Sequence, residues 1–541
     1  MTLNMTDYDQ TYKDFRWEVP GYFNFAGDVI DKWADDPGKL AMLWVDDACT
    51  EIKKTFSDLS RASKKLANLL TSQGVKKNDV VMLVLPRNVE WWETFTACIR
   101  MGAVVAPETT LLTSKDLEYR ANTAEAVCII TNSDIAERFD EVADKCPTVR
   151  TRIVITEPRD GWLFYTDEAD KASDQFETAK TRSTDNCLLY FTSGTVGLPK
   201  MVIHTHSSYP MGHQVTGKFW LDLKPEDMHW NISDTGWAKA AWSSYFGPWH
   251  CGAAQFIHHT DRFDPRETLE LLSRYPVTTL CGSPIIYRML VLQDLNKYKF
   301  PGLRHCVGAG EPLNPEIIEI WKKATGCIIR DGYGQTETVL LCASFPCMEP
   351  RFGSMGKPAP GIDLQVIDEN GTILPPDTEG DIAVRVRPER PLGLFKEYWK
   401  DPDRTASVYR GDWYLTGDKA YRDEDGYFWF VGRSDDVILT SSGYRIGPFE
   451  VESALIEHPA VAESAVVSSP DKVRGEVVKA FVILMPGYTG SDELVRELQG
   501  HVKKVTAPYK YPRKIEFVEN LPKTISGKIR RVELRNKEWG K

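Results

Sequence analysis

Short apolar runs alternate with segments of helical period as far as about Leu280, and this alternation restricts the fold more than any other feature. The runs at 80–85 and 126–131 are rich in β-branched residues, whereas apolar residues in 58–74 recur every three or four positions. Strands that alternate with helices in this way build parallel sheets covered by the helices. We therefore expect an α/β protein with parallel sheets flanked by helices.

Two later changes of pattern divide the chain, whose 541 residues exceed what one hydrophobic core holds. Between 353 and 432 the segments become short strands with Glu-Asn-Gly and Glu-Asp-Gly tips, which favour hairpin turns and a small β subdomain. The last part reads as strand, glycine-bearing loop, helix, strand and a final helix at 492–505. We expect a large N-terminal domain at 1–434, which includes the β subdomain, and a small α+β C-terminal domain at 435–541, joined at 434–436.

Composition excludes several classes of protein. Hydrophobic residues make up 42% and charged residues 26%, which is typical of a folded globular protein. The net charge of -11 argues against sequence-independent nucleic-acid binding, which needs a basic face. We find no Cys-x-x-Cys pair, no secretory or transit pattern at the start and no apolar run of about 18 residues. We expect a cytoplasmic enzyme without a membrane span, and leave a homo-oligomer open.

A loop rich in glycine and hydroxyl residues follows an apolar strand and ends at Lys200. Its hydroxyls can donate to an anion, its glycines let backbone amides approach one, and the lysine adds a charge. The residues are Thr192, Ser193, Gly194, Thr195, Gly197 and Lys200. Taken alone, such a loop is more often a plain turn, and Pro199 before the lysine departs from the Walker pattern. The whole string from Tyr190 is far more specific, and it indicates a polyphosphate site.

This string resembles the phosphate loop of the adenylate-forming superfamily, which contains acyl-CoA synthetases, luciferases and peptide-synthetase adenylation domains. Further signatures of that family follow in the expected order at 308–313, 331–338, 414–418, 432–452 and 522–531. Segments 234–237, 473–481 and 506–517 look most like medium-chain acyl-CoA synthetases. The resemblance implies an enzyme that joins a carboxylic acid to coenzyme A through an acyl-adenylate, with ATP and Mg²⁺. Val196, where many relatives carry Thr or Ser, is a departure in the phosphate loop.

The resemblance assigns nucleotide roles that the chemistry also requires, because attack of a carboxylate on the α-phosphate brings two anions together. Glu337 is the implied Mg²⁺ ligand and Thr336 the hydroxyl on the α-phosphate. Asp418 would accept from the ribose hydroxyls, and Arg433 would donate to the same sugar. The remaining implied ATP or AMP contacts are Gly310, Glu311, Pro312, Asp331, Gly332, Tyr333 and Gln335.

Two half-reactions need two arrangements of the C-terminal domain, which relatives reach by rotation about a hinge. The hinge corresponds to Asp435, and Lys528 resembles the lysine that bridges carboxylate and α-phosphate during adenylation. Rotation would withdraw Lys528 and present Gly443, past which the pantetheine arm of coenzyme A would run. The implied contacts with coenzyme A are Trp237, Tyr444, Arg445, Arg474 and Lys510.

The expected acyl pocket gives the substrate class. It comprises Trp237, Gly308, Tyr333 and Gly334. Acetate and propionate enzymes of the superfamily carry a bulky Trp just before Gln-Thr-Glu, where this chain has Gly334. Each buried methylene contributes about 0.8 kcal/mol, so the missing indole predicts a medium-chain acid as substrate.

Other readings remain open at this stage. The same Gly334 would admit aromatic or short branched acids such as benzoate or 2-methylbutyrate. A catalytically inactive ATP-binding scaffold is disfavoured because Lys528, Glu337 and Asp418 occur together. A peptide-synthetase module is disfavoured because no carrier domain follows, and a luciferase because the chain lacks a Ser-Lys-Leu terminus.

Overall fold

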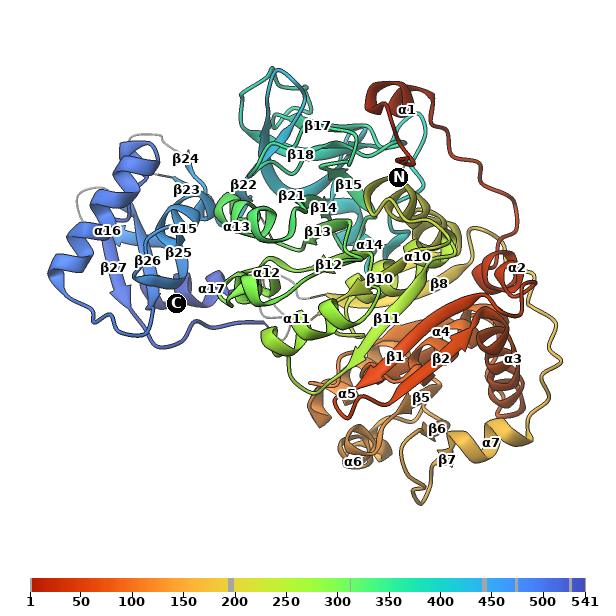
Figure 1. Cartoon of the computed structure of the whole chain (residues 1–541). Helices are drawn as coiled ribbons and strands as arrows, with labels where there is room; N and C mark the ends of the chain where they lie inside the picture. Colours follow the sequence, from red (N-terminus) through yellow and green to blue (C-terminus); the bar gives the residue numbers. More distant parts are fainter. Residues whose placement is uncertain are drawn as a thin grey trace.

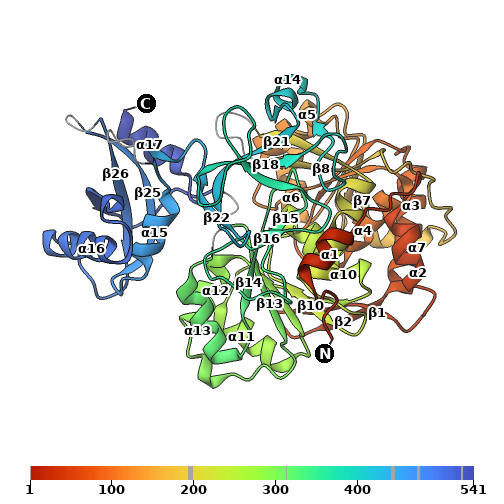
Figure 2. The same cartoon turned by 90° about the horizontal axis from the view of Figure 1, so that it is seen from above.

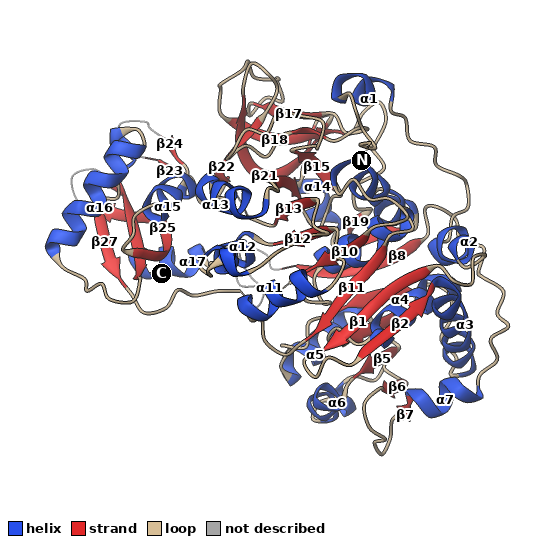
Figure 3. Cartoon of the chain, in the orientation of Figure 1, coloured by secondary structure: helices blue, strands red, loops and turns tan. Residues whose placement is uncertain are grey.

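The computed structural model describes residues 2–192, 199–311, 313–439, 445–471, 475–524 and 528–540. Two large sheets with helices on their faces form most of the molecule, and a small antiparallel sheet lies beside them (Figure 1). A separate body at the C-terminal end, blue in Figures 1 and 2, lies to one side in both views. The expected α/β class is therefore confirmed, as the strands and helices of Figure 3 show.

The first large sheet has eight strands in the order β19-β9-β8-β4-β3-β5-β6-β7, and β3 to β8 pair in parallel. Their bounds are β3 Val80–Val84, β4 Val104–Pro107, β5 Cys128–Thr131, β6 Thr151–Val154, β7 Leu163–Phe164, β8 Asn186–Thr192, β9 Lys200–Thr205 and β19 Glu397–Tyr398. The helices of this part are α3 Phe56–Ser72, α4 Val89–Met101, α5 Ser114–Ala124, α6 Ser133–Asp140 and α7 Tyr165–Lys171. Helix α3 begins where Thr55 and Asp58 form a capping box, within two residues of the expected start.

The second large sheet has nine strands in the order β16-β15-β14-β13-β12-β10-β11-β1-β2. Their bounds are β1 Leu40–Asp46, β2 Glu51–Thr55, β10 Met228–Asn231, β11 Ala254–His259, β12 Thr279–Gly282, β13 His305–Ala309, β14 Ile329–Gly334, β15 Leu340–Ala343 and β16 Lys357–Pro358. Strands β1 and β10 to β14 are parallel, so their carboxyl ends meet at one edge. Three helices start at a proline after an N-cap: α11 Pro265–Arg274, α12 Pro284–Val291 and α13 Pro315–Thr325.

Residues 207–250, on either side of β10, form short turns of helix. They are α8 His213–Val215, α9 Ala238–Ala241 and α10 Gly247–His250, joined by π-helical turns at Ser207–Met211, Thr216–Trp220 and Trp242–Phe246. Helices α1 Tyr8–Asp14 and α2 Asp31–Trp33 precede the first strand. The π-helical turns bring aromatic side chains of this segment against the second sheet, where they line the cavity described below.

The small sheet is antiparallel and comprises β17 Leu364–Ile367, β18 Gly380–Arg385, β20 Tyr409–Arg410, β21 Trp413–Arg422 and β22 Phe428–Arg433, with α14 Pro402–Ser407 beside it. The predicted turn at 424–426 joins β21 to β22 as a hairpin. After the turn at 369–371, the chain pairs with β17 only through an isolated antiparallel bridge between Ile367 and Ile373. Two prolines follow at 375 and 376, and because they lack N–H groups the pairing stops there.

The C-terminal body has a sheet in the order β25-β26-β27 and a separate pair, β23 with β24. The strands are β23 Ile438–Leu439, β24 Arg445–Ile446, β25 Val461–Asp471, β26 Gly475–Leu484 and β27 Lys514–Phe517. The helices are α15 Pro448–Ile456, α16 Asp492–Val505 and α17 Arg531–Trp539, and α16 has the bounds expected from sequence. No helix of the described ranges is long and apolar enough to cross a membrane.

Candidate active site

A cavity of about 150 Å³ lies where β13 and β14 end, beside the aromatic segment around α9. The indoles of Trp220 and Trp242 are 5.8 Å apart between ring centroids and form part of its wall together with Val339 and Leu340. The polar part of the lining comes from His213, Thr216, Lys239, Gln335, Thr336, Thr338 and Lys528. The cavity lining therefore combines apolar and polar side chains.

Strand β14 places alternate residues on opposite sides, and this decides which of its residues reach the cavity. Gly332 and Gly334 line the cavity, and a Cβ atom on Gly332 would lie only 2.3 Å from the Trp220 ring. Tyr333 faces the other way, and its hydroxyl donates to Asp418 over 2.6 Å. Glycine at 332 thus lets an indole pack directly on the strand.

The structure also changes the interpretation of Gly334. A Cβ atom there would lie 2.6 Å from the backbone oxygen of Val339, so its side-chain direction leads to backbone and not to open space. Trp220 and Trp242, which the sequence analysis missed, form the bulky wall instead. Their only sequence signal is a tryptophan-rich stretch after His213, which is equally typical of a core.

Asp418 is held in a buried network in the middle of β21. Its side chain is 5% exposed and accepts from Tyr333 and from Gln335 Nε2, the latter over 2.8 Å. Arg433 lies opposite it in the β21–β22 register. Burial raises the pKa of Asp418, while the charge of Arg433 and the two donors act against this rise. The carboxylate is thus fixed in position, with a cation beside it.

Glu337 and Lys200 form a buried ion pair on the other side of the site. Lys200 Nζ lies 2.5 Å from Glu337 Oε1, and the Tyr398 hydroxyl donates to the same oxygen over 2.8 Å. Burial acts to raise the pKa of Glu337, but Lys200 and Tyr398 outweigh it and hold this pKa below its ordinary value. Glu337 is therefore ionised at neutral pH, and Lys200, the first residue of β9, is directed to it.

The other residues predicted to contact the nucleotide come from both large sheets. Thr336 lines the cavity, and its backbone oxygen contacts His204 Nε2 at 2.7 Å. Thr192 Oγ1 is buried and forms no hydrogen bond with the described residues. Gly310 has φ of +113°, which a side chain would strain, and Glu311 follows it. Asp331 is buried, which raises its pKa to about 7.

Lys528 reaches this cavity from the C-terminal body. It lines the cavity together with Thr336 and Gly310, and its turn is closed by a bond from Thr524 N to Lys528 O of 2.7 Å. Arg535 on α17 donates to the Asp435 backbone oxygen over 2.6 Å and lies 2.7 Å from Asp436 Oδ1. These contacts fasten the last helix to the segment that joins the two bodies.

Lys239 on α9 is a cavity residue that the sequence analysis missed. Its ammonium donates to the Ala309 backbone oxygen over 2.8 Å. Burial lowers the pKa of Lys239, and the nearby charge of Lys528 acts in the same direction. Two lysines from distant parts of the chain therefore line one small cavity, an arrangement that attracts an anion.

Several predicted residues lie elsewhere or outside the described residues. Trp237, Gly308 and Tyr333 were predicted to form the acyl pocket, but they do not line this cavity, because Tyr333 turns to Asp418 and Trp237 precedes α9 as its N-cap. Lys510 forms an ion pair with Glu450. Of Arg445, only the backbone in β24 is described. The predicted residues outside the described ranges are Ser193, Gly194, Thr195, Gly197, Pro312, Gly443, Tyr444 and Arg474.

Comparison with known proteins identifies the class. The model of the AMP-binding enzyme family matches residues 30–399, and that of the AMP-binding enzyme C-terminal domain matches 450–528. The chain belongs to the family of AMP-binding enzymes. It is 54% identical to the mitochondrial acyl-coenzyme A synthetase ACSM3 of Rattus norvegicus, over 99% of this chain and 94% of that protein. The predicted acyl-CoA synthetase of the adenylate-forming superfamily is confirmed, with ATP and coenzyme A as substrates of this class.

Solved structures agree with this assignment. The anthranilate CoA ligase AuaEII in complex with anthranoyl-AMP has a TM-score of 0.88 and 32% identity, and the alignment covers 96% of this chain and 98% of that one. An ATP-bound RpMatB-BxBclM chimera has a TM-score of 0.84 and 27% identity, with coverage of 95% and 99%. The first of these structures holds an acyl-adenylate, anthranoyl-AMP, and the second holds ATP.

The expected cytoplasmic location is wrong on this comparison. The acyl-coenzyme A synthetases that match at 52% to 54% identity are all named as mitochondrial proteins. The expectation relied on the absence of a secretory or transit pattern in the first residues, and that absence does not determine the compartment.

Proposed function

We propose that this enzyme converts a medium-chain carboxylic acid to its acyl-CoA thioester, with release of AMP and pyrophosphate. The observation that carries the proposal is the convergence of Lys528, Thr336 and Gly310 on one cavity that Trp220 and Trp242 also line. The polar part of the lining suits a carboxylate and an α-phosphate, and the apolar part suits an alkyl chain. The lining thus supports acyl transfer to a nucleotide at this position.

In the first half-reaction, the carboxylate oxygen attacks the α-phosphorus of ATP, and pyrophosphate leaves with the electron pair of the broken P–O bond. Lys528 would neutralise the two anions as they approach, and Thr336 would donate to the α-phosphate. Asp418, held by Tyr333 and Gln335, supplies an acceptor for the ribose hydroxyls. Such fixed charges and donors act without reorganisation, which is the main source of catalysis in phosphoryl and acyl transfer.

Glu337 would hold Mg²⁺ together with the phosphate oxygens. A buried, ionised carboxylate is the kind of hard oxygen ligand that this cation prefers. Lys200 and Tyr398 both contact Oε1, so these two contacts leave Oε2 to a metal. When bound, the ion would neutralise charge on the transferring phosphates.

In the second half-reaction, the thiol of coenzyme A attacks the acyl carbon, and AMP leaves. We propose a domain boundary at residues 434 and 435 and a rotation at Asp435, which would withdraw Lys528 and admit pantetheine. The contacts of Arg535 with Asp435 and Asp436 lie at this junction, so rotation would have to rearrange them. The proposed coenzyme A residues Trp237 and Lys510 would act in that second arrangement.

A ligase for aromatic or short branched acids is the second candidate. It is favoured by the two indoles facing a cavity of only about 150 Å³, because flat walls and limited depth suit a ring or a branched chain.

Substrate preference separates these two candidates. Thioester formation is measured with ATP, Mg²⁺ and coenzyme A across the even acids from acetate to dodecanoate, plus benzoate and 2-methylbutyrate. The proposal expects the highest kcat/KM at hexanoate to decanoate, and a maximum at benzoate or 2-methylbutyrate would replace it with the second candidate.

A further inference from the structure

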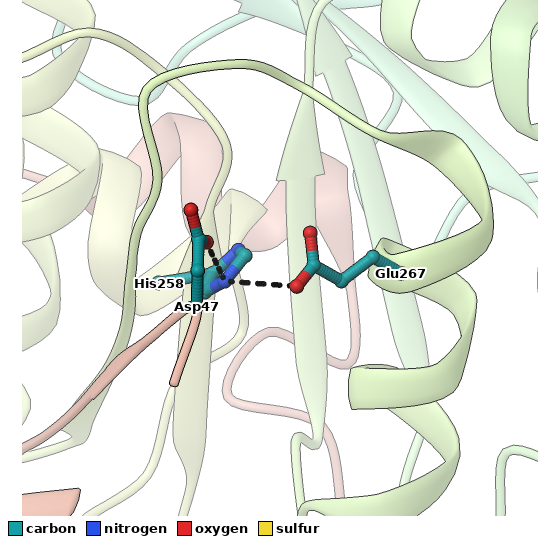
Figure 4. A group of neighbouring side chains, drawn as sticks. All are labelled: Asp47, His258 and Glu267. Carbon is teal, nitrogen blue, oxygen red and sulfur yellow. Dashed lines mark ion pairs between the residues drawn. The ribbon is translucent and has the colours of Figure 1, made fainter. Parts of the chain in front are cut away.

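Three metal-ligating side chains converge at the carboxyl ends of β1 and β11, outside the cavity described above. Asp47 follows β1, His258 belongs to β11, and Glu267 lies in the first turn of α11. Figure 4 shows both carboxylates directed toward the imidazole of His258. His258 Nε2 is 3.2 Å from Asp47 Oδ1 and 3.7 Å from Glu267 Oε1.

The environment of His258 leaves its ring nitrogen available. Its side chain is 6% exposed, and Nε2 is buried without forming a hydrogen bond of acceptable geometry. Within the described ranges, no lysine or arginine lies within 4.0 Å of the carboxylate of Asp47 or Glu267, although both face the same imidazole. Arg87 donates to the backbone oxygen of His258, and its charge acts on Asp47, but among the described residues it forms no ion pair with either carboxylate. Two carboxylates without an ion pair to lysine or arginine, beside a buried nitrogen, form a set of three donors that one positive ion would satisfy.

The backbone holds these donors in place. Parallel pairing of β1 with β11 sets Val45 opposite His258, which puts Asp47 just beyond the end of the ladder. Asp264 caps α11 by accepting from the backbone N–H groups of Arg266 and Glu267. The donors thus come from three elements, each positioned by its own backbone hydrogen bonds.

We propose that Asp47, His258 and Glu267 bind one Zn²⁺ ion, with water completing the coordination. Zn–N and Zn–O bonds of about 2.0–2.2 Å in a tetrahedron place donor atoms roughly 3.3–3.5 Å apart, and the observed 3.2 and 3.7 Å bracket that range. An imidazole nitrogen favours Zn²⁺ over Mg²⁺ and Ca²⁺, which prefer oxygen ligands alone. The ion would link the start of α11 to the ends of β1 and β11. This site would be separate from Glu337, the proposed Mg²⁺ ligand.

Calorimetric titration of the metal-free full-length enzyme with Zn²⁺ tests the proposal. We expect one equivalent of Zn²⁺ per chain, and His258→Gln and Glu267→Gln should each weaken binding by at least about tenfold. Glu270→Gln is the matched control, because Glu270 is an exposed acid one turn further along α11 and outside the cluster. It should bind Zn²⁺ as the wild type does.

Thermal unfolding provides a second readout that does not depend on activity. At the same Zn²⁺ concentration, Zn²⁺ should raise the Tm of the wild type and of the Glu270→Gln variant equally, and it should raise the Tm of the Glu267→Gln variant by less. Glu267 is 36% exposed at its side chain, so this variant should fold even if His258→Gln does not. The proposal is overturned if the wild type takes up no zinc, or if Glu267→Gln binds it as tightly as Glu270→Gln.

Discussion

Lys528 is the residue for which the position in the cavity makes the sharpest prediction. Replacement by Ala removes one of the two lysines that line the cavity, the one contributed by the C-terminal body. We expect acyl-adenylate formation to fall by roughly 10²–10³-fold, by analogy with loss of one transition-state donor. Thioester formation from pre-made acyl-AMP should change little, because the lysine acts only while the carboxylate and the α-phosphate approach. Single-turnover assays of each half-reaction measure this, and an equal loss in both would refute the assignment.

Trp220 should set the length of acid that fits. Trp220→Leu enlarges the cavity by about two methylenes, worth ~1.6 kcal/mol or roughly 15-fold in kcat/KM for the longer acids. The preferred acid should therefore lengthen by about two carbons, as measured across butyrate to dodecanoate. Trp321→Leu is the matched control, since both indoles are buried, with ring nitrogens that form no hydrogen bond, but Trp321 lies on α13 outside the cavity. If Trp321→Leu lengthened the preferred acid equally, the change could not be attributed to the cavity wall.

Residue positions could be predicted where a motif carries them, and less well where packing decides them. The positions of Glu337, Asp418 and Lys528 at one site follow the predicted motifs. The aromatic cavity wall could not be predicted, because Trp220 reaches it only through a π-helical turn and through the absence of a Cβ on Gly332. Neither feature has a periodic signal in the sequence.

At the scale of elements, the prediction was best where hydrophobic period and caps agree. Helix α16 and the strands near 80 and 130 were predicted within a few residues. The segment between 207 and 250 was not, because its aromatic residues follow no single period and it forms short α-helical and π-helical turns on either side of β10. The turn at 369–371 formed only a bridge, because two prolines end the pairing.

The junction at Asp435 makes a prediction at this scale. Asp435→Pro fixes φ near roughly −65°, and no hydrogen bond from the Asp435 N–H is found among the described residues. With Lys528 at the cavity in this arrangement, the variant should retain adenylation and lose thioester formation by an order of magnitude or more. Asp435→Ala, which leaves the backbone free to rotate, should keep both half-reactions. Wild-type thioester formation by the proline variant would place the hinge elsewhere.

At the scale of the whole molecule, one cavity is lined by residues that are distant in sequence and belong to two bodies. Gly310 and Thr336 follow β13 and β14 of the second large sheet, and Lys528 comes from the C-terminal body. The order of motifs along the chain indicates this assembly, but their convergence in space becomes visible only in the fold. Because Lys528 lies at the cavity in this arrangement, we expect the acid and ATP to react before coenzyme A takes part.

Acid-dependent exchange of pyrophosphate into ATP, measured without coenzyme A, tests this requirement most directly. We predict exchange with octanoate that disappears when the acid is omitted, and after addition of coenzyme A one AMP for each thioester formed. Formation of ADP in place of AMP, or exchange that does not depend on the acid, would contradict an acyl-adenylate route.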